Sequence, residues 1–180
     1  MKCKNCKDLF TPKWFNWKYC NKDFCHNLGV KESVAQVRKD KEKFNRKETK
    51  KAKEKLLTHR DYLKLLQTVF NTFIRTRDKE LPCVSCGKNN EKQFHAGHYR
   101  SVGSCPELRF NELNVWRQCA TCNTYLHGNL IEYRKELINR IGVNKVEWLE
   151  GVQPSAKMLI PEIKEKIKEY KEKIKDLNKF

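Results

Sequence analysis

The stretch HAGHYRSVGSCPELRFNELNVWRQCATCN, residues 95–123, gathers two histidines, three asparagines and a CxxC pair in one short segment. Its composition favours a strand, a loop with Gly103 and Pro106, and a second strand, and CNTYLHGNLIEYRKEL then favours a helix. Another CxxC pair stands in LPCVSCG, residues 81–87. We therefore expect a ββα unit whose ends are clamped by two cysteine pairs.

The composition of the whole chain limits what surrounds this unit. Of the 180 residues 34% are charged, and the mean hydropathy is −0.85, which favours small modules on helical connectors over one large apolar core. The net charge of +17 points to a polyanionic partner, most plausibly nucleic acid. The sequence shows no apolar run of membrane-spanning length, and MKCKNCKDLF lacks the apolar core of a signal peptide, so we expect a cytoplasmic protein with no membrane partner.

Nine cysteines in a reducing compartment call for a role other than disulfide formation. A CxxC turn places two thiolates at the separation that tetrahedral zinc requires, and two such elements close a four-ligand structural site. The spacing predicts two zinc sites and leaves over only Cys105. One site would use Cys83, Cys86, Cys119 and Cys122; the other would use Cys3, Cys6 and Cys20 with either Cys25, which we favour, or the adjacent His26.

Aromatic residues are frequent between the first cysteines. We expect most of them to form the small core around that metal, with base stacking as the less favoured interpretation. They are Phe10, Trp14, Phe15, Trp17, Tyr19 and Phe24.

The sequence divides into four segments: a zinc-binding module at 1–29, a basic arm at 30–60, the ββα domain at 61–150 and a charged helix at 151–180. The arm is rich in lysine and lacks Gly and Pro over most of its length, so it is either a long solvated helix or partly disordered. An amphipathic helix begins near Asp61, and the C-terminal helix could pack on it or pair with a partner. We expect the arm to lie along phosphates through lysines such as Lys39, Lys43, Lys47 and Lys51.

The polar residues of the ββα unit match the needs of a metal-dependent nuclease. His98 would end the first strand as a general base, Asn114 would open the second strand and hold the imidazole, and Asn123 would begin the helix as a metal ligand. These residues fill the three positions of an HNH (His-Me finger) motif, with asparagine in place of its last histidine. His95 and His127 could assist in holding the cation, and Arg100 and Arg109 could grip flanking phosphates. The expected class is therefore α+β, mostly helical.

Several segments resemble the NinG/Rap recombination endonucleases of lambdoid phages and prophages. They are FIRTRDKELPCVSCG, HAGHYRS, ELRFNELN, QCATCN and GNLIEYRKELINRIG, and the N-terminal cysteine module, basic arm and C-terminal helix extend the likeness over nearly the whole chain. The resemblance implies a metal-dependent endonuclease that cuts branched DNA such as Holliday junctions and D-loops. It also implies a phage or prophage origin, action in the bacterial host, and a phage recombinase or annealing protein as a companion.

Two positions depart from the usual motif. His95 stands where an aspartate is usual, and Leu126, beside His127, stands where a lysine is usual. Nitrogen ligands favour softer cations than magnesium, so the sequence leaves magnesium and manganese open as the catalytic ion. A homodimer is expected because symmetric junctions offer two equivalent strands. A non-catalytic zinc-containing DNA-binding protein and an RNA-binding or RNA-processing factor are the alternative functions.

Overall fold

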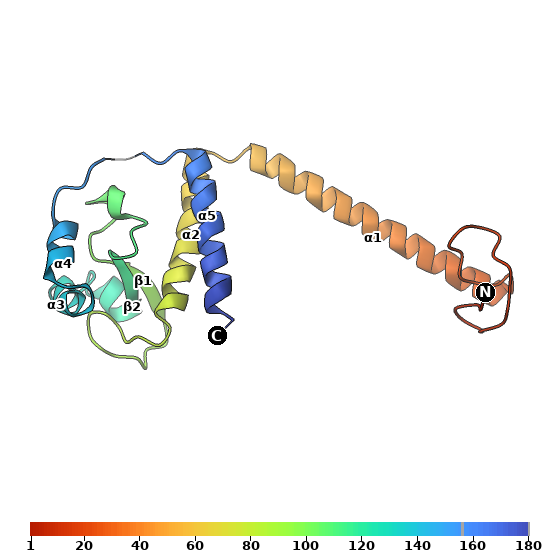
Figure 1. The fold of residues 1–180 in the computed structure, drawn as a ribbon, viewed down its shortest axis with the longest axis horizontal. Helices are drawn as coiled ribbons and strands as arrows, with labels where there is room; N and C mark the ends of the chain where they lie inside the picture. Colours follow the sequence, from red (N-terminus) through yellow and green to blue (C-terminus); the bar gives the residue numbers. More distant parts are fainter. Residues whose placement is uncertain (156, 180) are drawn as a thin grey trace. The chain divides into compact units, whose positions relative to one another are not determined.

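The computed structural model describes residues 1–155 and 157–179, and these fold as two compact units, Met1–Leu57 and Thr58–Phe180 (Figure 1). The boundary between the units falls inside the segment 30–60 expected to form the basic arm, because its last residues begin the second unit. None of the helices in the described ranges is long and apolar enough to cross a membrane.

The first unit consists of a small cysteine-rich module and one long helix. A single antiparallel bridge joins Lys2 to Leu9, and α1 runs from Asp23 to Lys55. The basic arm is therefore helical, and its helix begins inside the module, because Cys25 lies in the first turn of α1. Only Cys25 and Gly29 of α1 are buried, so most of this helix is solvated.

The second unit is built on two helices that lie side by side, α2 (His59–Arg77) and α5 (Ile160–Leu177) (Figure 1). Thr58 and Asp61 form a capping box at the start of α2, and each side chain accepts a hydrogen bond from the other's backbone N–H. Aromatic rings close the interface, with Tyr170 of α5 lying 5.1 Å from the rings of both Phe70 and Phe73. The expected amphipathic helix near Asp61 is confirmed, and the C-terminal helix packs on it.

The central segment forms an antiparallel ribbon followed by helices. Strand β1 (Phe94–His98) pairs with β2 (Val115–Cys119), with Phe94 opposite Cys119 and His98 opposite Val115. A 3₁₀ turn, η1 (Pro106–Leu108), lies in the connecting loop. A π-helical turn, η2 (Thr121–Tyr125), follows β2, and α3 (Leu130–Ile141) and α4 (Val143–Glu150) come next.

A core beneath the ribbon fixes α3 and α4 in place. It contains the fully buried side chains of Val84, Leu108, Tyr133, Leu137, Val146 and Leu149, together with Cys105. The Tyr133 hydroxyl donates a hydrogen bond to the carbonyl of Gly97 at 2.9 Å, which ties α3 to β1. Cys105, the cysteine that the zinc sites leave over, is therefore a core residue.

Candidate functional site

The His98 ring is held at the end of β1 by a main-chain group. Its Nε2 lies 3.0 Å from the carbonyl oxygen of Arg109. Because a carbonyl can only accept, Nε2 carries the proton and Nδ1 keeps a free lone pair. Burial lowers the pKa of His98 below its ordinary value, against the raising effect of this hydrogen bond. The ring is therefore neutral near pH 7, with one nitrogen able to accept a proton.

The Asn114 side chain makes different hydrogen bonds from the expected one. Its fully buried amide donates to the carbonyls of Arg100 and Leu108, at 3.0 and 3.1 Å, and accepts from the Arg100 backbone N–H at 2.8 Å. The expectation that Asn114 holds the imidazole directly is wrong, because the carbonyl of Arg109 has that position and the buried amide must satisfy its own hydrogen bonds. The Asn114 side chain instead ties the start of the loop, at Arg100, to Leu108, the residue before the one that carries this carbonyl.

Asn123 lies in η2 and contacts His95. The Asn123 Nδ2 atom is 3.0 Å from Nδ1 of His95, and Leu126 N–H donates to the carbonyl of Thr121, five residues back, at 3.0 Å. The expected helix start at Asn123 is thus a wide π turn, a distortion that is frequent at functional sites. His127 follows with φ 48°, a left-handed conformation uncommon for a residue other than glycine.

A cleft of about 470 Å³ brings most of these side chains together. Its lining includes His98, Asn123, His127 and Arg100. His95 is outside the described cleft lining and contacts one of its residues, Asn123. The described residues that line the cleft include two imidazoles and one carboxamide but no carboxylate.

The two arginines proposed to grip phosphates have their guanidinium groups engaged within the fold. Arg100 donates to the carbonyls of Leu149 and Glu150, both at 2.9 Å, and so satisfies the C-terminal end of α4. Arg109 donates to Gln67 of α2 at 2.7 Å, and its guanidinium lies 5.0 Å from the ring centre of Phe110. Their interactions are structural, although Arg100 also forms part of the cleft wall.

The second cysteine group lies beside the ribbon. The sulfur atoms of its four members are within 4.8 Å of one another. Backbone N–H groups point at two of them, since Cys119 N–H donates to Cys83 Sγ at 3.3 Å and Cys122 N–H to Cys119 Sγ at 3.4 Å. Such donors stabilise thiolates, the form that binds metal, so Cys83, Cys86, Cys119 and Cys122 could hold a zinc ion.

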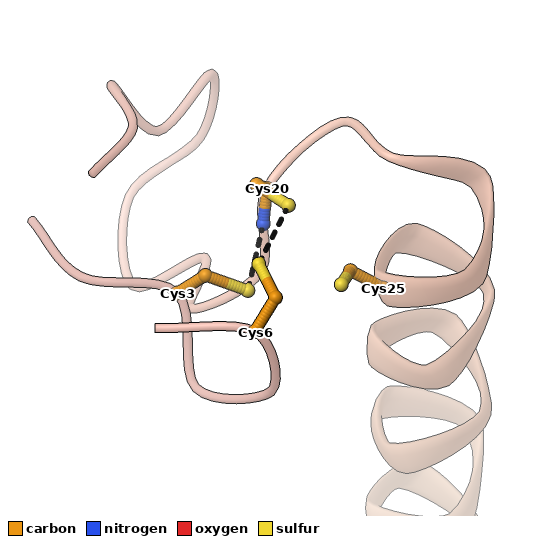
Figure 2. Close-up of side chains that lie close together, drawn as sticks. All are labelled: Cys3, Cys6, Cys20 and Cys25. Atoms are coloured by element: carbon orange, nitrogen blue, oxygen red, sulfur yellow. Dashed lines mark hydrogen bonds between the residues drawn. The ribbon is translucent and has the colours of Figure 1, made fainter. Parts of the chain in front are cut away.

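The first cysteine group also brings four sulfur atoms together, and its fourth member is Cys25 and not His26. Cys25, in the first turn of α1, points toward Cys3, Cys6 and Cys20, and the four sulfurs lie within 4.8 Å (Figure 2). His26 instead packs against Trp17, with ring centres 5.4 Å apart. Burial raises the pKa of the Cys3 thiol, but backbone N–H groups, led by that of Cys20, lower it to about 6. This group could hold a second zinc ion.

The aromatic residues of this module divide into two sets. Tyr19 is buried and Phe10 and Trp17 are half-buried against the cysteines, as expected for a small core. Trp14, Phe15 and Phe24 are exposed, so the expectation that they also form the core is wrong for these three. The cysteines leave room for only a few rings around them, and the others remain at the surface.

Lysines of α1 form an exposed basic strip. Lys39, Lys43 and Lys47 line one shallow groove on the helix, because residues four apart lie on the same face. Lys51 continues this spacing and pairs with Glu48 at 3.0 Å. The strip is continuous enough to lie along several phosphates.

Sequence reasoning missed two groups that build the site. The carbonyl of Arg109 left no signal, because a main-chain atom is common to every residue. Gln118, fully buried in β2, donates to Ser85 Oγ and to the carbonyl of Gly128, both at 2.6 Å, and so joins the Cys83–Cys86 turn to the loop beside His127. A glutamine inside the strand VWRQC, opposite a histidine, was the signal for it.

Comparison with known proteins gives a consistent result. The family model described as Bacteriophage Lambda NinG protein matches residues 1–179. Protein ninG of Escherichia phage lambda is 39% identical over 179 residues, which cover 91% of this chain and 86% of that protein. Protein ninG of Escherichia phage 933W is 39% identical over 163 residues, and that of Salmonella phage P22 is 37% identical over 165 residues; each match covers 83% of this chain and 79% of the relative.

No solved structure matches the chain. The family match extends from the N-terminal cysteine module, through the basic helix and the ribbon, to the C-terminal helix. The chain therefore belongs to the NinG family of bacteriophage proteins.

Proposed function

We propose that this protein is a metal-dependent DNA endonuclease that hydrolyses phosphodiester bonds in the cleft at the end of β1. The observation that carries the proposal is the position of His98, whose ring is oriented by a carbonyl and lies in a cleft with Asn123 and His127. The order of β1, β2 and the helical turn that bears Asn123 is that of an HNH-type ββα unit. This order supports the assignment of His98 as the base.

The proposed reaction is an in-line hydrolysis. His98 Nδ1 takes a proton from a water molecule, whose oxygen forms a bond to the scissile phosphorus while the bond from phosphorus to the 3′-oxygen breaks. The leaving oxygen takes up a proton from solvent. The products carry 5′-phosphate and 3′-hydroxyl ends. Asn114 is a positioning residue here, because it holds the loop whose carbonyl orients His98.

A divalent ion in the cleft would neutralise charge that develops on the phosphate and the leaving oxygen. Asn123 and His127, which line the cleft, and His95, which contacts Asn123, would supply ligand atoms to such an ion. An amide oxygen and imidazole nitrogens suit manganese better than magnesium, which prefers carboxylates and water. Manganese is therefore the ion that we expect to support the higher rate.

Branched DNA is the proposed substrate, in the cytoplasm of the bacterial host. The charge of +17 and the basic strip on α1 support a nucleic-acid substrate, and membership in a phage family supports the location. The preference for junctions and D-loops, a homodimeric state and a companion phage recombinase or annealing protein rest on the resemblance of the sequence to recombination endonucleases.

One alternative has an observation in its favour. A non-catalytic zinc-containing DNA-binding protein would explain why the described cleft lining has no carboxylate and why Arg100 and Arg109 are engaged in the fold. Such a protein should hold two zinc ions and gain nothing from added magnesium or manganese.

The test uses labelled DNA of defined structure. Purified full-length protein is incubated with a four-way junction, a D-loop and a linear duplex, each with manganese, magnesium or chelator, and with duplex RNA as competitor. We expect manganese-stimulated cuts at the branch of the first two substrates and none in the linear duplex. Binding without any cut under all ion conditions would favour the non-catalytic alternative, and preferential competition by RNA would favour an RNA-binding factor.

A further inference from the structure

The loop between Cys6 and Cys20 is closed at its base by the first cysteine group. The two sulfur atoms lie 3.5 Å apart, and Cys20 N–H donates to Cys3 Sγ at 3.3 Å (Figure 2). At the far part of the loop, Trp17 N–H donates to the carbonyl of Trp14 at 3.2 Å, and Asn16 has a left-handed φ of 63°. The loop is therefore a defined turn on a fixed base.

This turn displays two aromatic side chains to solvent. Phe15 is 96% exposed and Trp14 58% exposed, and the Trp14 ring meets the half-buried Trp17 ring edge-on, with ring centres 5.9 Å apart. The edge contact with Trp17 steadies Trp14 while most of its surface stays open. Phe15 and most of the Trp14 ring lie outside the core of the module, and exposed apolar surface of this kind commonly marks a binding site.

The charge around the turn defines the chemistry of the partner. Residues 1–57 carry 17 Lys and Arg against 7 Asp and Glu, a net charge of +10. Lys13 directly precedes the two rings, and Lys18 follows them, both exposed. Aromatic faces set among lysines are the combination by which proteins bind single-stranded nucleic acid, since bases stack on the rings while phosphates meet the cations.

We propose that Trp14 and Phe15 form a stacking site for unpaired bases of a single-stranded polynucleotide, with Lys13 and Lys18 facing its phosphates. This inference rests on the proposed function, because a D-loop, one of the proposed substrates, carries a displaced strand of unpaired bases. A lipid surface would call for a broader apolar face than two rings between Lys13 and Asn16. The N-terminal module would thus bind single-stranded nucleic acid. The cleft that contains His98 lies in the other unit.

The experiment compares affinities of full-length variants by fluorescence anisotropy. The test variant is Trp14→Leu with Phe15→Leu, the conservative variant is Phe15→Tyr, and the matched control is Phe44→Leu, which alters an exposed aromatic on α1. The probes are oligothymidine, an abasic oligonucleotide of equal length and charge, oligouridine, linear duplex DNA and vesicles of phosphatidylglycerol. Zinc content and circular dichroism check that each variant is folded.

Loss of stacking has a distinct signature. We expect the leucine variant to bind oligothymidine about 5- to 100-fold more weakly per stacked base. Its affinity for the abasic probe and the duplex, and the salt dependence of its binding, should stay unchanged, and Phe15→Tyr and Phe44→Leu should bind like wild type. If the leucine variant loses as much affinity for oligouridine as for oligothymidine, the same site binds both, and it accepts either sugar.

Unchanged affinity of the leucine variant for oligothymidine would overturn the proposal. So would an equal loss in Phe44→Leu, or a loss of vesicle binding alone. If the leucine variant binds like wild type while wild type still cuts junctions through His98, the stacking site falls and the nuclease assignment stands. If stacking is measured but no variant or wild type cuts DNA, the nuclease assignment falls instead.

Discussion

His98 owes its proposed role to three separate features of its surroundings. Burial favours the neutral ring, the carbonyl of Arg109 selects the tautomer, and the end of β1 places His98 in the wall of the cleft. A substitution of Arg109 that keeps its backbone in place should preserve the tautomer, because the hydrogen bond to His98 is made by the carbonyl. The Asn114 side chain helps to fix the position of that carbonyl, through its hydrogen bonds to Arg100 at the start of the loop and to Leu108, the residue before Arg109.

The lowered pKa of His98 sets the expected pH dependence of cleavage. A general base works in its neutral form, and burial shifts the pKa of His98 below 6.5, the ordinary value for histidine. The rate of junction cleavage should therefore be flat from about pH 7 upward and fall only below about pH 6.5. A pH–rate profile under single-turnover conditions, with DNA binding measured at each pH, tests this expectation. An acid limb centred above pH 7 would contradict it.

The same pKa has a consequence for stability. The unfolded chain takes up a proton on His98 near pH 6.5, whereas the folded chain resists protonation until the pH is lower. The contribution of His98 to the free energy of unfolding is thus complete above that pH and is lost as the pH falls toward the folded-state pKa. Acid should weaken the fold and the proposed activity in the same direction.

The lack of a Cβ atom at Gly97 leaves space for the side chain of Gln118 and its hydrogen bonds. A Cβ atom added at Gly97 would lie 2.2 Å from Oε1 of Gln118, whose Nε2 bonds Ser85 and the Gly128 carbonyl. Gly97→Ala should therefore lower the free energy of unfolding by about 1–3 kcal/mol, through overpacking and disturbance of these bonds. Urea denaturation of the full chain measures the change.

Gly103 supplies the matched control for that substitution. The nearest atom to an added Cβ there is Ser101 Oγ, at 3.9 Å, and the backbone of Gly103 is outside the left-handed region. Gly103→Ala should change stability by less than about 1 kcal/mol, in either direction. Equal destabilisation by both variants would mean that Gln118 does not require the space at Gly97.

Each of the two cysteine groups should bind one zinc ion. Wild-type protein should contain about two zinc ions per chain, because each group offers four thiolates. Cys25→Ser should remove about one of them, whereas His26→Asn should keep both, since His26 packs against Trp17 outside the group. Elemental analysis of the purified variants decides between these residues. Loss of zinc from His26→Asn with retention in Cys25→Ser would reverse the assignment.

The elements differ in how well the sequence predicts them. The paired cysteines, the two strands and the amphipathic helix near Asp61 follow from local spacing and periodicity, and the structure contains all of them. The π turn at Asn123 could not be predicted, because it depends on where Cys122 must lie. The exposure of Phe15 and the hydrogen bonds of Arg100 to α4 also could not be predicted. Both depend on how the chain folds in three dimensions and not on local sequence.

Binding by the whole molecule should be largely electrostatic. Replacing Lys39, Lys43, Lys47 and Lys51 with glutamine removes four charges from the exposed strip on α1 and leaves both cysteine groups untouched. If these lysines neutralise phosphates, the slope of log K against log salt should become less steep by up to about 3–4, with zinc content unchanged. Anisotropy titrations with junction DNA between low and physiological salt measure the slope. An unaltered slope would remove the strip from the DNA interface.

The proposed nuclease activity depends on His98 as the general base in the cleft. The decisive measurement is single-turnover cleavage of a labelled four-way junction with manganese by wild type, His98→Ala and His59→Ala. His59 is the matched control, because its Nε2 also bonds a carbonyl, that of Met158 at 2.8 Å, but it lies in a different part of the unit. We expect His98→Ala to lose about 10²- to 10⁴-fold in rate with junction affinity and zinc content unchanged, and His59→Ala to cut like wild type. Wild-type cleavage by a folded, zinc-loaded His98→Ala protein would contradict the account and place the active site elsewhere.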